Sequence, residues 1–166
     1  MVEEKGVASE LVSLRGKTIK PCLGCYQCVT TARCAQTDDD FAEVLDKMRT
    51  AQGIILASPV YVSSVVPQMM ALLARATFIA YWNDKFFTGK LGGPITVARR
   101  AGHNMAFSQL LLWFFINGIT VPGSTYWNVG TAGARGATDA DQDQEGIDTV
   151  RFFAANLVDH LRKLSA

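Results

Sequence analysis

Residues 53–59 read GIILASP, and this short run decides the fold class. Its apolar part, residues 53–57, is continuous and is flanked by Gly53 and Pro59, which is typical of a strand buried on both faces of a parallel sheet. A second buried run lies at residues 95–98, and residues 119–122 predict a third short strand. Strands of this kind need crossover connections, so the chain is expected to alternate strands with helices.

Helical periodicity fills the intervals between these strands. Apolar residues recur at helical spacing in residues 38–50, 67–81, 105–117 and 145–164, while residues 10–14 predict one more strand and residues 125–143 a loop. The order predicts a single α/β domain over residues 1–166, with a doubly wound parallel sheet and helices on both faces. Ligands bind such sheets beyond the carboxyl ends of the strands, where residues 58–64, 98–104 and 123–136 would lie.

The composition and charge of the chain argue against a nucleic-acid-binding, exported or membrane-spanning protein. The chain has 166 residues, 49% of them apolar and 19% charged, with a net charge of +1. Nothing in that balance indicates a nucleic acid or an anionic membrane as partner. Residues 1–16 have no apolar export signal, and the longest apolar stretch, residues 105–121, is interrupted by polar residues. We therefore expect a cytoplasmic protein without a membrane span, in a compartment where disulfides are rare.

The cysteines form the most specific motif in the chain. All four lie in CLGCYQCVTTARC, residues 22–34, with the spacing C-x2-C-x2-C-x5-C. Three closely spaced thiolates can wrap one small body and a fourth can close the site, so the spacing predicts a [4Fe-4S] cluster in a loop over residues 21–38. The predicted ligands are Cys22, Cys25, Cys28 and Cys34. Structural zinc, which usually takes two separated pairs of ligands, disulfides and plain core cysteines remain the alternatives.

Two stretches together resemble a known family. Residues 19–39, IKPCLGCYQCVTTARCAQTDD, and residues 53–75, GIILASPVYVSSVVPQMMALLAR, resemble the iron-sulfur flavoproteins of the NADPH-dependent FMN reductase superfamily. The resemblance covers about residues 10 to 130. It implies a flavodoxin-like fold, one FMN and one [4Fe-4S] cluster per subunit, and a homodimer or homotetramer. It also implies single-electron transfer between cluster and FMN, with NAD(P)H or a ferredoxin-like protein as electron donor.

The resemblance also implies which residues meet the flavin. The loop after residues 53–57 would lie against the isoalloxazine ring, with serine hydroxyls adding hydrogen bonds, and residues 98–103 would form the second flavin loop. Paired arginines there suit a phosphate of FMN or of a nicotinamide cofactor, or are plain surface charge. The implied FMN contacts are Ser58, Pro59, Val60, Tyr61, Ser63, Arg99, Arg100, Gly102 and His103. No residue is assigned as a general acid or base.

The chain departs from the family at its start. The family opens with a strand and a polar, Gly-rich loop that cradles the FMN phosphate, and no such segment precedes residues 10–14 here. We expect an N-terminally truncated sheet, or a phosphate held in another way. Three functions remain open: electron transfer between a [4Fe-4S] cluster and FMN, an NAD(P)H-dependent FMN or quinone reductase without a cluster, and a truncated non-enzymatic module with a structural metal.

Overall fold

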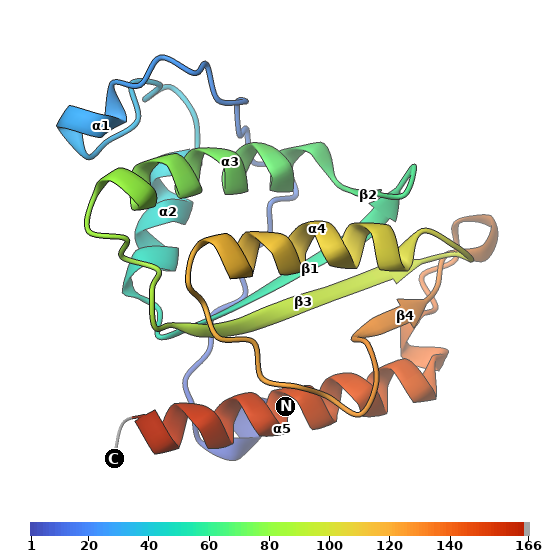
Figure 1. The fold of residues 1–166 in the computed structure, drawn as a ribbon. Helices are drawn as coiled ribbons and strands as arrows, with labels where there is room; N and C mark the ends of the chain where they lie inside the picture. The colour runs from blue at the N-terminus through green and yellow to red at the C-terminus, as the bar shows by residue number, and fades with distance from the viewer. Residues whose placement is uncertain (165–166) are drawn as a thin grey trace.

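The structure is a computed structural model that describes residues 1–164, and its centre is a four-stranded sheet in the order β2-β1-β3-β4 (Figure 1). The strands are β1 (Gly53–Tyr61), β2 (Ser64–Val65), β3 (Leu91–Ala98) and β4 (Val129–Thr131). Strands β1, β3 and β4 are parallel, whereas β2 folds back as a two-residue antiparallel hairpin on the end of β1. The sheet is therefore mixed, not wholly parallel as the sequence predicted.

Helices cover both faces of this sheet, as the sequence predicted. Helix α3 (Pro67–Trp82) follows β2, and α4 (His103–Ile116) connects β3 to β4; both lie on one face, and α5 (Gln144–Leu164) lies on the other (Figure 1). The remaining helical segments are α2 (Phe41–Thr50), α1 (Cys28–Thr31) and three short 3₁₀ turns at Glu3–Lys5, Ala134–Gly136 and Ala140–Gln142. Across residues 1–164, no helix is both long and apolar enough to cross a membrane.

Two adjacent glycines let helices approach β3 from both sides. A Cβ atom on Gly92 would lie 2.7 Å from Cε1 of Phe114 in α4, and one on Gly93 would lie 2.6 Å from Cζ of Phe153 in α5. These separations are shorter than real carbon contacts, and a Cβ on Gly92 would also clash with the Ile54 carbonyl of β1. A side chain at Gly92 would therefore disturb both α4 and the pairing with β1, and one at Gly93 would push α5 away from the sheet. Strand β3 is accordingly buried on both faces over residues 91–94, and residues 95–98 form its second half, where Thr96 and Ala98 are buried and Ile95 and Val97 are half-buried. The prediction of a strand at residues 95–98 is confirmed.

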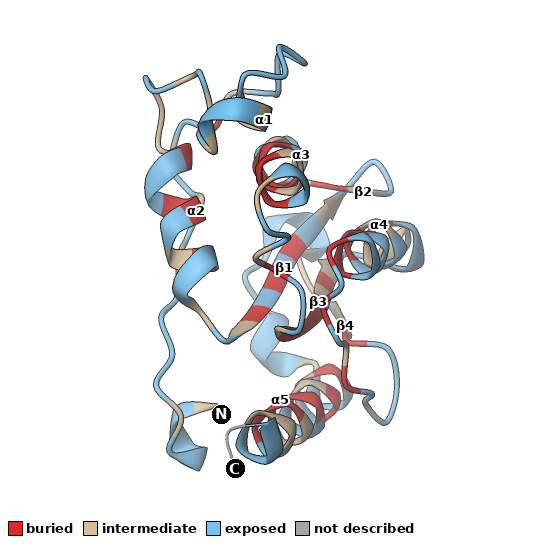
Figure 2. Ribbon diagram, turned by 60° about the vertical axis from the view of Figure 1, so that its left-hand side comes forward, coloured by how far each residue is buried: buried red, intermediate tan, exposed pale blue. Residues whose placement is uncertain are grey.

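Strand β1 differs from its prediction. Its burial alternates, with Ile54, Leu56 and Ser58 buried and Ile55 and Ala57 exposed (Figure 2). Ile54 pairs with Gly92 and so lies on the face that α4 covers, whereas Ile55 pairs with Gly93 on the opposite face. Helix α5 packs on β3 and β4 and reaches Gly53 at the start of β1, but Ile55 and Ala57 stay exposed on the second face of this strand. The prediction of a strand buried on both faces was therefore wrong for β1.

Residues 10–14 do not form the predicted strand. Val12 and Leu14 pack on the core, but their backbone pairs with no strand among residues 1–164. A strand exists only as part of a hydrogen-bonded ladder, so an apolar pattern without a neighbouring strand remains an extended segment. Ion pairs from Lys47 to Glu10 and from Lys17 to Glu43 hold the segment and the turn after it against α2.

The strand predicted at residues 119–122 is reduced to a single bridge, and the strand that pairs with β3 lies further along the chain. At residues 119–122 only Thr120 makes a bridge, to Leu91, because Pro122 has no N–H with which to continue the ladder. The chain then leaves the sheet and returns as β4, which pairs Val129 with Thr96. Strand β4 lies inside residues 125–143, which the sequence predicted as loop, so that prediction was wrong for residues 129–131.

Candidate cofactor sites

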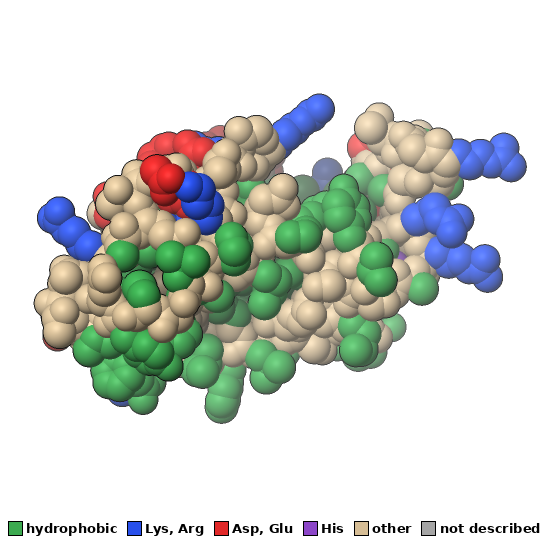
Figure 3. Space-filling view, turned by 90° about the horizontal axis from the view of Figure 1, so that it is seen from above, with side chains coloured by type: hydrophobic (Ala, Val, Ile, Leu, Met, Phe, Trp, Pro, Cys, Tyr) green, Lys and Arg blue, Asp and Glu red, His purple; other side chains and the backbone are tan. Residues whose placement is uncertain are grey.

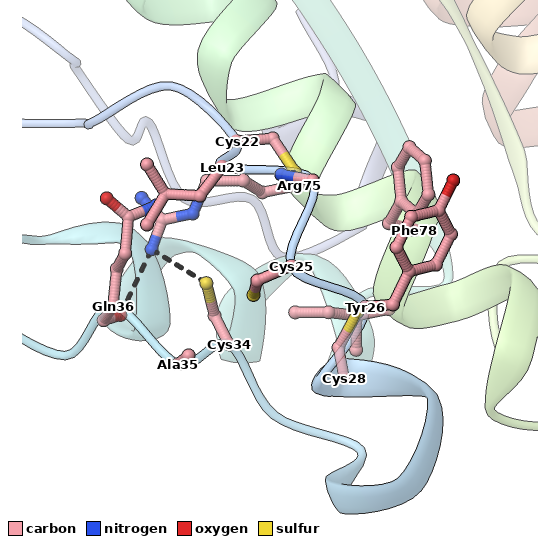
Figure 4. A pocket seen from close by; sticks show the side chains of 12 residues that line it. Cys22, Leu23, Cys25, Tyr26, Cys28, Cys34, Ala35, Gln36, Arg75 and Phe78 are labelled. Atoms are coloured by element: carbon pink, nitrogen blue, oxygen red, sulfur yellow. Dashed lines mark hydrogen bonds between the residues drawn. The ribbon is translucent and has the colours of Figure 1, made fainter.

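All four cysteines line one pocket beside α3 (Figure 4). Arg75, Phe78 and Ile79 of α3 form its other wall. The loop bends around the pocket through left-handed backbone conformations, which Gly24 adopts without strain at φ 64°. Cys22 and Cys25 are exposed, whereas Cys28 and Cys34 are half-buried and pack against the core. The structure thus brings the predicted ligands together.

The thiols are free but are not yet arranged as ligands. None of the four is in a disulfide, and within residues 1–164 no three His, Cys, Asp or Glu side chains form a ready-made metal group. The Gly24 N–H donates to Sγ of Cys22 at 3.4 Å, the kind of contact that stabilises a thiolate.

The charges of the other three cysteines act on the thiol of Cys28. Burial raises the pKa of the Cys28 thiol, and the charges of Cys22, Cys25 and Cys34 raise it further, although a backbone hydrogen bond opposes them. Four thiolates in one pocket repel one another, so the ionised state needs a positive partner. A metal ion or an iron-sulfur cluster supplies that charge, and the donor set fits such a group.

A buried ion pair lies beneath the cysteine loop. The Arg75 and Asp39 side chains are each 1% exposed and form a two-armed pair. Burial by itself would raise the pKa of Asp39, but hydrogen bonds from Arg75 and the Lys20 N–H outweigh it and leave that pKa lowered. Arg75 also donates to Sγ of Cys34 at 3.3 Å. The sequence assigned no role to Arg75, although the stretch that carries the family resemblance ends at this residue.

The second site is a cavity of about 560 Å³ at the carboxyl ends of β1 and β3. The last residues of β1 form the first wall. The end of β3 and Arg99 form the second wall, and the segment after β4 forms the third. The lining residues are Pro59, Val60, Tyr61, Val97, Ala98, Arg99, Ala132, Gly133, Ala137, Thr138, Asp139, Ala140 and Asp141. A cleft in this position is where open α/β sheets bind ligands, as the sequence predicted.

Four of the predicted FMN contacts line this cavity: Pro59, Val60, Tyr61 and Arg99. Arg100 and Gly102 lie in the loop that enters α4 and His103 is the first residue of that helix, and the three are not among the lining residues. Basic side chains gather at this end of the molecule, whereas the face over α3 and α4 carries many hydrophobic ones (Figure 3).

The other predicted contacts have structural partners. The Ser58 hydroxyl donates to the Pro59 carbonyl at 2.8 Å and accepts the Val66 N–H at 3.1 Å, which fixes the exit from β1. Nε2 of His103 lies 2.9 Å from the Gly130 carbonyl and joins α4 to β4. Ser63 lies in the two-residue turn between β1 and β2 and packs against Gly102. These contacts shape the rim of the cavity.

Sequence reasoning placed residues 123–136 at the strand ends but missed residues 137–141, which complete the third wall of the cavity. The Gly133 N–H donates to Oδ1 of Asp139 at 2.7 Å, and the Thr131 N–H donates to Asp143 at 2.7 Å. These carboxylates fold residues 132–141 back over the strand ends. The signal was present in the alternating aspartates and glycines, but it became meaningful only once residues 129–131 were known to form a strand.

Comparison with solved structures defines the class of protein. The chain superposes on RosB, solved with the bound intermediate 8-demethyl-8-formylriboflavin-5'-phosphate, with a TM-score of 0.75 at 19% identity, covering 99% of this chain and 69% of that chain. It superposes on a WrbA-like flavodoxin from Agrobacterium tumefaciens with a TM-score of 0.59 at 14% identity, covering 73% of each chain. The fold is therefore flavodoxin-like, as the resemblance implied.

Comparison of sequences gives the family. An iron-sulfur flavoprotein of Archaeoglobus fulgidus is 30% identical, covering 99% of this chain and 87% of its own. One from Methanocaldococcus jannaschii is 32% identical, covering 90% of this chain and 79% of its own, and one from Methanosarcina thermophila is 29% identical, covering 97% and 82%. Residues 1–134 match the NADPH-dependent FMN reductase family. The chain belongs to that family and is an oxidoreductase, which confirms the resemblance.

Proposed function

We propose that this chain transfers electrons between a [4Fe-4S] cluster on Cys22, Cys25, Cys28 and Cys34 and an FMN in the cavity at the strand ends. The observation that carries the proposal is the convergence of all four cysteines on one pocket. The names of the relatives, iron-sulfur flavoproteins, support both cofactors together. A flavin handles one or two electrons and a cluster handles one, so the pair couples the two kinds of chemistry.

The residues of the cysteine pocket suit a cluster better than a structural zinc ion. The four thiols follow one another within a single short loop with the spacing C-x2-C-x2-C-x5-C, whereas a structural zinc ion usually takes two separated pairs of ligands. The loop lies at the surface, where Cys22 and Cys25 are exposed. An electron can therefore enter or leave near the cluster without crossing the core.

The cavity at the strand ends suits FMN. Its volume of about 560 Å³ is within the range of cofactor pockets. Pro59, Val60 and Tyr61 supply an apolar wall for a flat ring, and Arg99 is the one basic residue among the cavity's lining residues in the described chain. We assign Arg99 to the FMN phosphate and the backbone of residues 59–61 to the flavin edge. NADPH, after which the family is named, is the proposed hydride donor.

The proposed assembly is a homodimer or homotetramer that includes α4. Its outer face exposes Leu112 at 67%, Phe115 at 82% and Ile116 at 63%. Large apolar side chains gathered on one helix face are typical of a protein interface. A ferredoxin-like protein is the proposed one-electron partner, because it would match the cluster's single-electron chemistry.

The test is the cofactor content of the chain after anaerobic purification and reconstitution. We expect about four irons and four acid-labile sulfides per chain together with bound FMN. In Cys25→Ser the iron should be lost and the FMN kept, whereas Thr30→Ser, a control in the same loop outside the pocket, should keep both. FMN without iron would identify a cluster-free reductase instead, and zinc without flavin would identify a structural module.

A further inference from the structure

Arg75 is an unusual residue to find in the wall of the cysteine pocket. Its side chain is 1% exposed, and arginine is almost never so deeply buried unless it is paired. The guanidinium lies 3.9 Å from the ring centre of Phe41, which packs against its face. A cation placed here carries a desolvation cost that its hydrogen bonds must offset.

The partners of Arg75 lie on both sides of the cysteine loop. It donates to the Lys20 carbonyl at 3.1 Å, ahead of Cys22, and to the Gln36 carbonyl at 3.1 Å, after Cys34. One side chain therefore closes the base of the loop and anchors it to α3. Lysine cannot reproduce this arrangement, since it has a single point of charge and no rigid fork of donors.

Two features of Arg75 go beyond anchoring the loop. Its Nη2 donates to Sγ of Cys34 at 3.3 Å, so the cation touches a predicted ligand, whereas the counter-charge, Asp39, does not line the pocket. Its Nε is buried and has no hydrogen-bond partner among residues 1–164, which is costly. A sulfur-rich group in the pocket would bring acceptors to this wall, and donors and positive charge beside an iron-sulfur cluster raise its reduction potential.

We propose that Arg75 is the positioning residue of the cysteine pocket, which holds Cys34 in place and whose charge favours the reduced state of a bound cluster. The inference rests on the proposed [4Fe-4S] site. It divides into two separable effects, one on how firmly iron is held and one on how easily the cluster accepts an electron.

The test compares Arg75→Met, Arg75→Lys and the double variant Arg75→Met/Asp39→Asn with the reconstituted wild-type protein. Lys90→Met is the matched control, because Lys90 also donates to two backbone carbonyls, those of Arg49 and Ala51, but does not line the pocket. Two quantities are measured anaerobically: the rate of iron release to a ferrous chelator, and the midpoint potential of the one-electron reduction of the cluster in a dithionite titration followed by EPR.

The two effects predict different patterns among the variants. Arg75→Met should lower the equilibrium constant for one-electron reduction about tenfold, a shift of about 59 mV. The midpoint potential of the double variant should lie between those of Arg75→Met and the wild type, because this variant also removes the negative charge of Asp39. Arg75→Lys keeps the charge, so its potential should stay near the wild-type value while its iron is released at least about fivefold faster, since the contacts to Cys34 and Gln36 are lost. Lys90→Met should change neither quantity.

Each alternative result overturns a definite part of the proposal. An unchanged potential in Arg75→Met and in the double variant would overturn the effect on reduction, and unchanged iron release in all three Arg75 variants would overturn the positioning role. If Arg75→Met does not fold, the double variant, which leaves no unpaired buried charge, decides the same question. Wild-type protein that binds no iron would overturn the proposed function along with this inference. If the wild type binds four irons and the Arg75 variants match it in iron release and midpoint potential, this inference alone is overturned.

Discussion

Replacing Asp39 by asparagine removes the charge that compensates Arg75 and leaves the shape of the site almost unchanged. The Asp39 side chain is 1% exposed and accepts hydrogen bonds from both arms of Arg75, from the Lys20 N–H at 2.9 Å and from the Phe41 N–H at 3.3 Å. Asparagine keeps one oxygen as acceptor but turns the other position into a donor that faces a guanidinium. The variant therefore leaves a buried cation without its counter-charge.

The size of the effect follows from that burial. Removing one partner of a buried ion pair costs about 3–5 kcal/mol, and we take the lower end, about 3 kcal/mol, because the pair lies beneath an exposed loop. With a urea dependence of about 2 kcal/mol/M, the unfolding midpoint should fall by about 1.5 M. Urea unfolding of the metal-free protein, followed by circular dichroism, measures this shift.

The pH dependence gives a second measure of the same pair. The pKa of Asp39 is lowered in the folded protein from its ordinary value of 3.8, mainly because Arg75 and the Lys20 N–H favour the carboxylate over the cost of burial. The stabilisation is therefore present above about pH 4 and is lost as the pH falls through the lowered pKa. Asp39→Asn should show less loss of stability than the wild type over that acid range.

Asp38→Asn is the matched control for Asp39→Asn. Asp38 is adjacent in sequence and pairs with Lys20, but its side chain is 73% exposed, so its removal should leave the urea midpoint unchanged. If Asp39→Asn unfolds at the same urea concentration as Asp38→Asn, the ion pair with Arg75 does not anchor the cysteine loop and our reasoning is refuted.

Three further predictions concern the sheet, the cavity and the helix face. Gly92→Ala should destabilise the protein by about 2 kcal/mol or more, because its Cβ would clash with the Ile54 carbonyl of β1 and with Phe114 of α4. Gly123→Ala, whose Cβ meets no described atom within 4 Å, should be tolerated, and thermal unfolding distinguishes the two variants. Arg99→Ala should weaken FMN binding at least about fivefold, and Arg100→Ala, outside the cavity lining, by less than about twofold, as measured by flavin fluorescence. Phe115→Glu should dissociate the homo-oligomer in sedimentation velocity, and an unchanged assembly would exclude α4 from the interface.

The sequence predicted the elements whose signals are local. Residues 67–81 were predicted as helix and form α3 (Pro67–Trp82), because Pro67 suits the first turn and a long apolar stripe follows it. The four cysteines are neighbours along the chain, so their convergence on one pocket required no long-range packing to be foreseen. The loops predicted at the strand ends do contribute Pro59, Tyr61 and Arg99 to the cavity.

What the sequence could not predict depends on distant parts of the chain. Arg75 meets Cys34 across 41 residues, and only the packing of α3 beneath the cysteine loop brings them together. Residues 10–14 have an apolar pattern, yet no strand among residues 1–164 lies beside them to complete a ladder. Strand β4 is three residues long, and the position of its neighbour β3, rather than its own composition, makes it a strand.

The central claim is that one chain holds both a one-electron and a two-electron centre, and counting electrons tests it most directly. The measurement is an anaerobic dithionite titration of the reconstituted wild-type protein, followed by absorbance. The Cys25→Ser variant is titrated in the same way. The account predicts uptake of about three electrons per chain, one by the cluster and two by the flavin, and about two in Cys25→Ser. Equal uptake by the two proteins would contradict it.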